Sequence, residues 1–193
     1  MDKDFIVSIS DLLVSIGTLG VALYALSVWK QQLLGTEKYN LLKNIMKSVY
    51  KFEEEVKSVR NPMISYTKED VDKSSEINVQ KEIYNKRYNG LVKEYLELKP
   101  LLMESKLHWD RNKIDELFSP LQSIVGELRG GIWMFFHIKE SDNPKNIDKK
   151  IREENYNLIY DVSSKDKLDN FSQKVNDIVK NIEIFIDTEM KKI

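Results

Sequence analysis

A long apolar stretch opens the chain. Between Phe5 and Trp29 the one charged side chain is that of Asp11, and residues 12–29 contain no Asp, Glu, Lys, Arg or His. A helix rises about 1.5 Å per residue, so this stretch spans roughly 37 Å as a helix, more than the roughly 30 Å hydrocarbon core of a bilayer. The pattern predicts a single transmembrane helix over residues 1–30.

Two other structures can contain such a stretch. A cleaved signal peptide is one, because Ala25, Leu26 and Ser27 weakly resemble a cleavage site. The acidic residues at the start and the length of the apolar run disfavour it. A buried core helix is the other, and it is disfavoured because the segment is apolar all round.

Basic residues flank the apolar stretch unequally. Only Lys3 precedes it, between two aspartates. Four lysines follow it closely: Lys30, Lys38, Lys43 and Lys47. By the positive-inside rule, the N-terminus lies outside and residues 31–193 lie in the cytoplasm. We expect a single-pass protein of the bacterial inner membrane, with membrane lipid as one partner.

Small and hydroxyl side chains share one face of the predicted membrane helix at steps of three and four. This face comprises Ser8, Asp11, Ser15, Thr18, Ala22, Ala25 and Trp29. Such residues let transmembrane helices approach and hydrogen-bond, which predicts a homo-oligomer or association with another membrane protein. Asp11 is costly in a bilayer unless it faces a partner or water, so the alternatives are that it reaches the headgroups or serves ion conduction.

Apolar residues repeat at heptad spacing through the remaining chain. The first seam runs Leu42, Ile45, Val49, Phe52, Val56 and Val59. Similar seams predict helices at about 36–60, 76–107, 111–138 and 165–192, with a short helix at about 147–159. Four rods of similar length predict an all-α fold. We expect an antiparallel, up-down-up-down four-helix bundle with long, coiled-coil-like helices.

Some helix ends carry sequence signals. Gly35 followed by Thr36 marks a break or an N-cap, and Ser75 is suited to cap the second predicted helix. Pro100 predicts a kink near Leu96. Pro120, after a serine, marks either a kink or a helix start.

Composition argues against most kinds of chemistry. The chain has no cysteine and two histidines, His108 and His137, so thiolate metal sites and cysteine nucleophiles are excluded. Gly130 and Gly131 lack the Lys-Ser/Thr continuation of a phosphate-binding loop. The net charge of -1 gives no basic footprint for nucleic acid. We expect no catalytic residue, cofactor or metal, and no enzyme.

Two places suit a cytoplasmic protein partner. Arg60 precedes a loop with acidic residues at positions 69, 70 and 72. Trp133 and Phe136 lie in an aromatic run where not every ring can face inward beside Phe135. The alternatives are a solvated loop for the first place and core packing for the second.

The run from Trp29 to Tyr39, WKQQLLGTEKY, is followed by Val49-Tyr50-Lys51 and by Arg60-Asn61-Pro62. Glu104 to Trp109 then match the Glu-x-x-x-x-Trp pattern that ends an acidic helix. Over about the first 110 residues, the chain resembles small uncharacterised bacterial membrane-anchored proteins with an Arg-Asn-Pro motif. This resemblance brings no activity or catalytic residues. It is associated with phage-defence (antiviral) or stress functions.

Two functional hypotheses follow. The first is a membrane-tethered helical protein that acts by assembly or partner binding, as a defence or stress effector. The second is a membrane-anchored enzyme or ion-handling subunit, which requires carboxylates or histidines converging inside the bundle. A plain structural adaptor lies between them.

Overall fold

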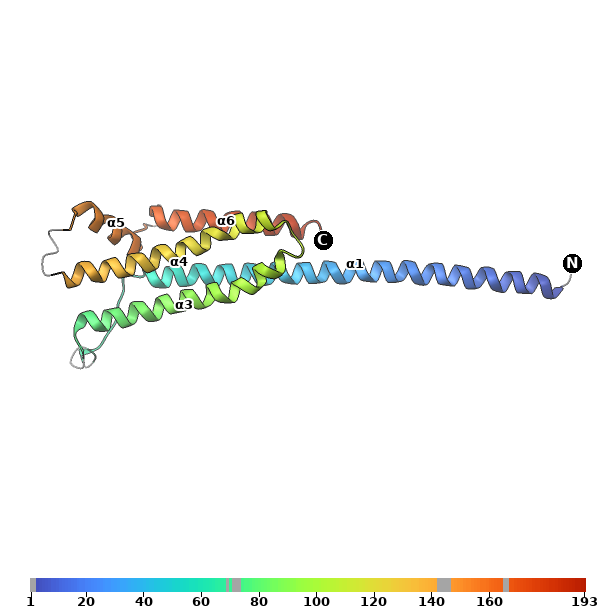
Figure 1. Ribbon diagram of the computed structural model, residues 1–193, viewed down its shortest axis with the longest axis horizontal. Coiled ribbons are helices and arrows are strands. Elements are labelled where there is room, and N and C mark those ends of the chain that lie inside the picture. The colour runs from blue at the N-terminus through green and yellow to red at the C-terminus, as the bar shows by residue number, and fades with distance from the viewer. Residues whose placement is uncertain (1–2, 69, 71–73, 142–146, 165–166) are drawn as a thin grey trace. The chain divides into compact units, whose positions relative to one another are not determined.

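The described part of the chain is entirely helical apart from its connections (Figure 1). The computed structural model describes residues 3–68, 70, 74–141, 147–164 and 167–193, with side chains from residue 13 onward. The helices are α1 (Lys3–Arg60), α3 (Glu76–Ser105), α4 (Arg111–Glu140), α5 (Lys149–Ile159) and α6 (Asn170–Met190). Within these residues the one β feature is an isolated bridge between Ser164 and Lys167. The predicted all-α class is confirmed.

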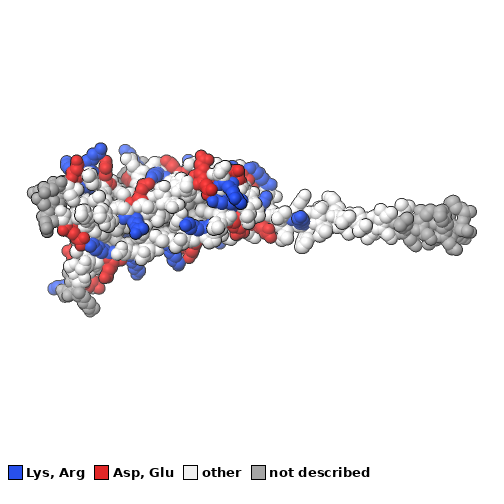
Figure 2. All heavy atoms as spheres, viewed as in Figure 1, with Lys and Arg blue, Asp and Glu red and all other residues white. Residues whose placement is uncertain are grey.

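The chain divides into two compact units, residues 1–40 with residue 193, and residues 41–192. In the first unit, α1 is the one described helix that is long and apolar enough to cross a membrane. Its most apolar 18-residue window has a mean hydropathy of 1.5, and none of that window is buried. Figure 2 shows few charged side chains along this part of α1.

The second unit is built around one hydrophobic core. Residues of α1 from Leu41 onward share it with α3, α4, α6 and Ile159 of α5. The predicted α1 seam is correct: Leu42, Ile45, Val49, Phe52, Val56 and Val59 are all buried. Figure 2 shows charges of both signs spread over the visible face of this unit. The heptad repeat therefore separates apolar from charged side chains as the sequence indicates.

The apolar seam that predicts the last helix comprises Leu168, Phe171, Val175, Ile178, Ile182 and Phe185. Four of these residues are buried in the structure, whereas Ile178 is half-buried and Leu168 is exposed and lies before α6. Val179 is buried in addition. The helix begins at Asn170 because Asp169 is its N-cap, with the carboxylate accepting a hydrogen bond from the backbone N–H of Ser172. The cap therefore sets where α6 begins, and its apolar residues determine which face packs inward.

One predicted helix boundary is wrong and two are correct. Helix α1 continues through Gly35, and the Thr36 hydroxyl donates to the Gln32 carbonyl at 2.9 Å, so no helix starts near residue 36 and Thr36 is not an N-cap. Helix α4 begins at Arg111, as predicted, and contains Pro120, so the alternative that Pro120 starts the helix is excluded. Ser75 caps α3 as expected, accepting from the backbone N–H of Asn78. Burial of the surrounding seam outweighs the local breaking tendency of glycine and proline.

Helix α5 packs closely on α4 at Gly131. A Cβ atom at this position would lie 2.7 Å from Cδ2 of Leu158 and 3.0 Å from Cδ1 of Ile159. The Asn155 amide donates to the Gly131 carbonyl at 2.9 Å in the same buried contact. Gly131 therefore serves the packing of two helices.

Candidate functional site

A groove between α3 and α4 lies on the surface of the second unit. It has a volume of about 440 Å³. Helix α3 contributes Lys81, Asn85 and Tyr88, and helix α4 contributes Arg129, Ile132, Trp133, Phe136, His137 and Glu140. These residues recur every three or four positions on each helix, so the groove follows one stripe of α3 and one stripe of α4.

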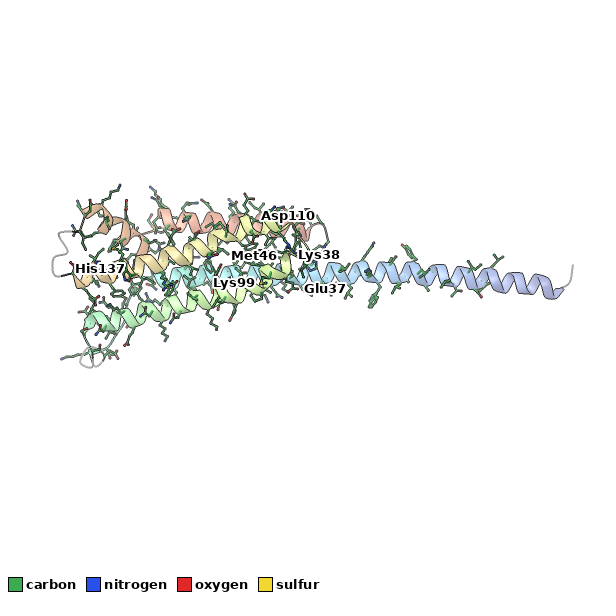
Figure 3. The ribbon with its side chains drawn as sticks, viewed as in Figure 1. Glu37, Lys38, Met46, Lys99, Asp110 and His137 are labelled. Atoms are coloured by element: carbon green, nitrogen blue, oxygen red, sulfur yellow. The ribbon has the colours of Figure 1, made fainter. Side chains whose placement is uncertain are left out.

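The groove contains both aromatic residues that the sequence predicts as a docking place. The Trp133 side chain is 63% exposed, and its ring stacks on His137 with centroids 5.1 Å apart and planes 5° apart. Figure 3 labels His137 in the last turns of α4. Phe136 is buried and packs edge-on against Tyr84 at 5.6 Å. Trp133 is therefore the residue that presents a ring to the surface, and Phe136 belongs to the core beneath it.

Positive charge is the second feature of the groove. Lys81 forms an ion pair with Glu140, which is the one acidic residue among the described residues that line the groove. Arg129 is exposed and makes no hydrogen bond or ion pair with the described residues. One guanidinium is thus available to an anion at the rim.

Arg60 is a buried structural residue. Its side chain is 2% exposed, and its guanidinium donates to the backbone carbonyls of residues 157, 158 and 160 at 2.8 to 2.9 Å. It also donates to the Ser172 hydroxyl at 2.6 Å and pairs with Asp169 at 3.1 Å. Arg60 thereby fastens the end of α1 to the connection between α5 and α6.

The predicted partner-binding place formed by Arg60 and the acidic loop after it is corrected at Arg60 by this geometry. Residues 69 and 72 lie outside the described residues, and the guanidinium turns to Asp169 instead. A different arginine holds the loop: Arg87 of α3 donates to the carbonyls of Asn61 and Met63 at 2.6 Å each. A buried guanidinium with these partners is not placed to contact a partner protein.

Asp169, the partner of Arg60, is the residue that sequence reasoning missed. Burial would raise its pKa, but the backbone N–H of Ser172 and the guanidinium of Arg60 hold the pKa well below its usual range. The carboxylate stays ionised and both caps α6 and neutralises Arg60. Its sequence signal was the aspartate directly before an amphipathic repeat, which is a helix-start pattern.

The predicted association face of the apolar helix is open in the first unit. The side chains of Ser8 and Asp11 lie outside the described residues. Ala22, Ala25 and Trp29 are exposed. Of the face's hydroxyl groups, that of Thr18 donates to the Val14 carbonyl at 2.8 Å, which satisfies its donor within the helix.

The described residues contain no cluster of three or more His, Cys, Asp or Glu side chains that could hold a metal ion. No protein-family model, curated protein or solved structure matches this chain. The site is therefore interpreted from its own geometry.

Proposed function

We propose that this protein is a single-pass, membrane-anchored helical protein that acts by assembly and partner binding rather than by catalysis. One observation carries the proposal. From Leu13 to Ser27 every residue of α1 is exposed, including large apolar side chains such as Val21 at 69% and Leu19 at 62%. Burying apolar surface is worth about 25 cal/mol per Å², so a water-exposed helix of this kind is unfavourable and a bilayer removes the cost.

We further propose that residues 41–192 form an antiparallel four-helix bundle. Contacts between the ends of α3 and α4 support this arrangement. Near one end of the α3–α4 pair, Tyr84 packs on Phe135 with ring centroids 5.8 Å apart, while at the other end Lys106 pairs with Asp115. The start of α3 thus meets the end of α4, as two successive helices joined by a short turn do.

In this proposal, the membrane is the bacterial inner membrane, the N-terminus is outside and the bundle is cytoplasmic. The lysines that follow the apolar stretch, from Lys30 to Lys47, support this orientation. The resemblance noted from the sequence supports a defence or stress response as the biological setting.

Assembly in the proposal uses the small-residue face of α1, which binds a second copy or another membrane protein. The exposure of Ala22 and Ala25 supports this role, because small residues let helix backbones approach closely in lipid. In the cytoplasm, the groove around Trp133 is the surface offered to a partner, since exposed aromatic rings are frequent anchors at interfaces.

Extraction of membranes tests the anchoring. The wild-type protein should stay in the pellet after washing with alkaline carbonate, which removes peripheral proteins. The double variant Leu19→Lys/Leu23→Lys should leave the membrane, because each charge near the centre of the span costs about 3 kcal/mol. A matched variant, Leu19→Val/Leu23→Val, should behave as the wild type. Recovery of the wild type in the soluble fraction would contradict the proposal.

The absence of cysteine from the chain makes orientation directly measurable. The variant Asp2→Cys should react with an impermeant maleimide on intact cells stripped of their outer membrane. The variant Asn112→Cys, at an exposed residue of α4, should react only after the cells are opened. The reverse pattern would contradict the orientation, and a purified mass lacking the first 27 residues would indicate a cleaved signal peptide.

A further inference from the structure

The indole of Trp133 has one covered face and one open face. His137, four residues later, stacks parallel to the indole at 5.1 Å. Side chains of a helix lean toward its N-terminus, so His137 covers the face of the indole that is nearer the C-terminal end of α4. Trp133 is nevertheless 63% exposed. The opposite face, directed toward the turn of Arg129, is therefore available for a planar ring.

A positive charge lies beside this open face. Arg129 precedes Trp133 by four residues, so the two side chains are neighbours on one face of α4, about 6 Å apart along the axis. The guanidinium makes no hydrogen bond or ion pair with the described residues. A ligand whose ring stacks on Trp133 thus has an anion-binding group one helical turn away.

Helix α3, which forms the opposite wall of the groove, adds polar groups, and the volume of the groove limits the size of the ligand. Asn85 of α3 is exposed and lines the groove, so its amide can bond the edge of a ring. Lys81 supplies a second cation, which is held by Glu140. The volume of about 440 Å³ falls within the range of small-molecule sites.

We propose that this groove binds a small organic anion with a planar ring. The ring stacks on the open face of Trp133, the anionic group pairs with Arg129, and Asn85 bonds the ring edge. Two kinds of molecule share this chemistry: a nucleoside monophosphate and an aromatic carboxylate. The inference specifies the partner of the cytoplasmic groove and rests on that part of the proposed function, but it does not depend on membrane insertion.

Isothermal titration calorimetry on the full chain in mild detergent tests the site. The probes are AMP and indole-3-acetate, with adenosine and inorganic phosphate as fragments that each lack one of the two features. We expect one of the two complete probes to bind with a Kd below about 1 mM and the fragments to bind much more weakly. Preference for AMP identifies a phosphate ligand, and preference for indole-3-acetate identifies a carboxylate ligand.

Two variants should weaken ligand binding and a third should tighten it. Trp133→Leu should weaken binding by roughly 5- to 100-fold through loss of stacking. Arg129→Gln should weaken it at least tenfold. Glu140→Gln should tighten it several-fold, because it frees Lys81 and removes a carboxylate that repels the ligand. Arg111→Gln, an exposed arginine at the start of the same helix, is the matched control and should change nothing.

Each of the other results would overturn the inference. Failure of both complete probes to bind, or equal binding to wild type and Arg129→Gln, removes the site. A change in oligomeric mass for Trp133→Leu without a change in ligand affinity identifies the groove as an interface between copies. Carbonate extraction and cysteine labelling do not involve the groove, so a failed membrane anchor is distinguished from a failed ligand site. Thermal unfolding of each variant verifies that it is folded.

Discussion

Gly130 and Gly131 are adjacent in α4 but have different surroundings. A Cβ atom at Gly130 would meet nothing within 4 Å, whereas at Gly131 it would lie 2.7 Å from Cδ2 and 3.1 Å from Cγ of Leu158. Glycine within a helix costs roughly 0.5 to 1 kcal/mol relative to alanine. At Gly130 nothing in the described structure offsets this cost, while at Gly131 the packing of α5 does.

Alanine substitutions at these two glycines should change the free energy of unfolding in opposite directions. Gly130→Ala should raise the free energy of unfolding by up to about 1 kcal/mol, because helix propensity improves without a clash. Gly131→Ala should lower it by about 1 kcal/mol or more, because the Cβ pushes Leu158 away and disturbs the Asn155 bond. Urea unfolding in mild detergent measures both. An equal gain for the two variants would show that α5 can move aside without cost.

The ion pair between Arg60 and Asp169 makes stability depend on pH. The folded state holds the pKa of Asp169 below its ordinary value near 3.8. A carboxyl with a depressed folded pKa stabilises the protein fully above the unfolded pKa. That contribution is lost as the pH falls through the unfolded pKa toward the folded one. The window for this effect is therefore below about pH 5.

Asp169→Asn tests the pair. The variant should be less stable than the wild type by about 2 kcal/mol at pH 7, because it leaves the buried Arg60 guanidinium without an opposite charge. Asparagine is also a good N-cap, so α6 should keep its start. The difference should shrink between pH 5 and pH 3 in denaturant unfolding series. Asp177→Asn, an exposed residue of α6, should show no such convergence, and a constant difference for Asp169→Asn would refute the argument.

At the scale of elements, short side chains determine where each helix of the second unit starts. Ser75 and three aspartates, Asp110, Asp148 and Asp169, cap α3, α4, α5 and α6. Each satisfies a backbone N–H that has no partner within the helix. Figure 3 labels Asp110 at the beginning of α4, where the chain turns back after α3.

Substitution of Asp110 should show the value of such a cap. Its carboxylate accepts from the Lys113 backbone N–H at 2.9 Å. Asp110→Ala should cost about 1 kcal/mol of stability, while Asp110→Asn should cost little, because the amide oxygen accepts the same bond. Chemical unfolding of the two variants measures the difference. Equal losses would mean that the charge of Asp110, rather than its capping bond, stabilises this turn.

Helix existence could be predicted from the sequence, while long-range partners could not. The α1 seam from Leu42 to Val59 follows from periodicity, which depends only on local spacing. The Arg60 interaction with Asp169 joins residues 109 positions apart, and no local pattern connects them. The aromatic run near Trp133 could be predicted only in part. Crowding indicates that one ring faces outward, but only the packing on Tyr84 identifies Phe136 as buried.

At the scale of the whole molecule, the two units differ in the polarity of their exposed side chains. Residues 41–192 bury an apolar core and expose charges of both signs, whereas the apolar part of α1 exposes its large side chains all round. A helix with apolar side chains on every face is unfavourable in water and is stabilised by lipid or by other helices. If lipid alone is its environment, any apolar residue serves equally well on every face. If other helices bind it, the face with small residues is special.

This difference leads to a prediction about assembly. The mass of the detergent-solubilised wild type should be that of an oligomer, and Ala22→Leu should reduce it toward a monomer, because the larger side chain keeps helix backbones apart. Ile16→Phe also adds three side-chain carbons, but on the side of the helix away from that face, and should leave the mass unchanged. Light scattering coupled to size-exclusion chromatography measures all three proteins. If Ile16→Phe and Ala22→Leu both give the same mass as an oligomeric wild type, copies associate elsewhere. A monomeric wild type would instead direct the search to a different membrane protein that binds this face.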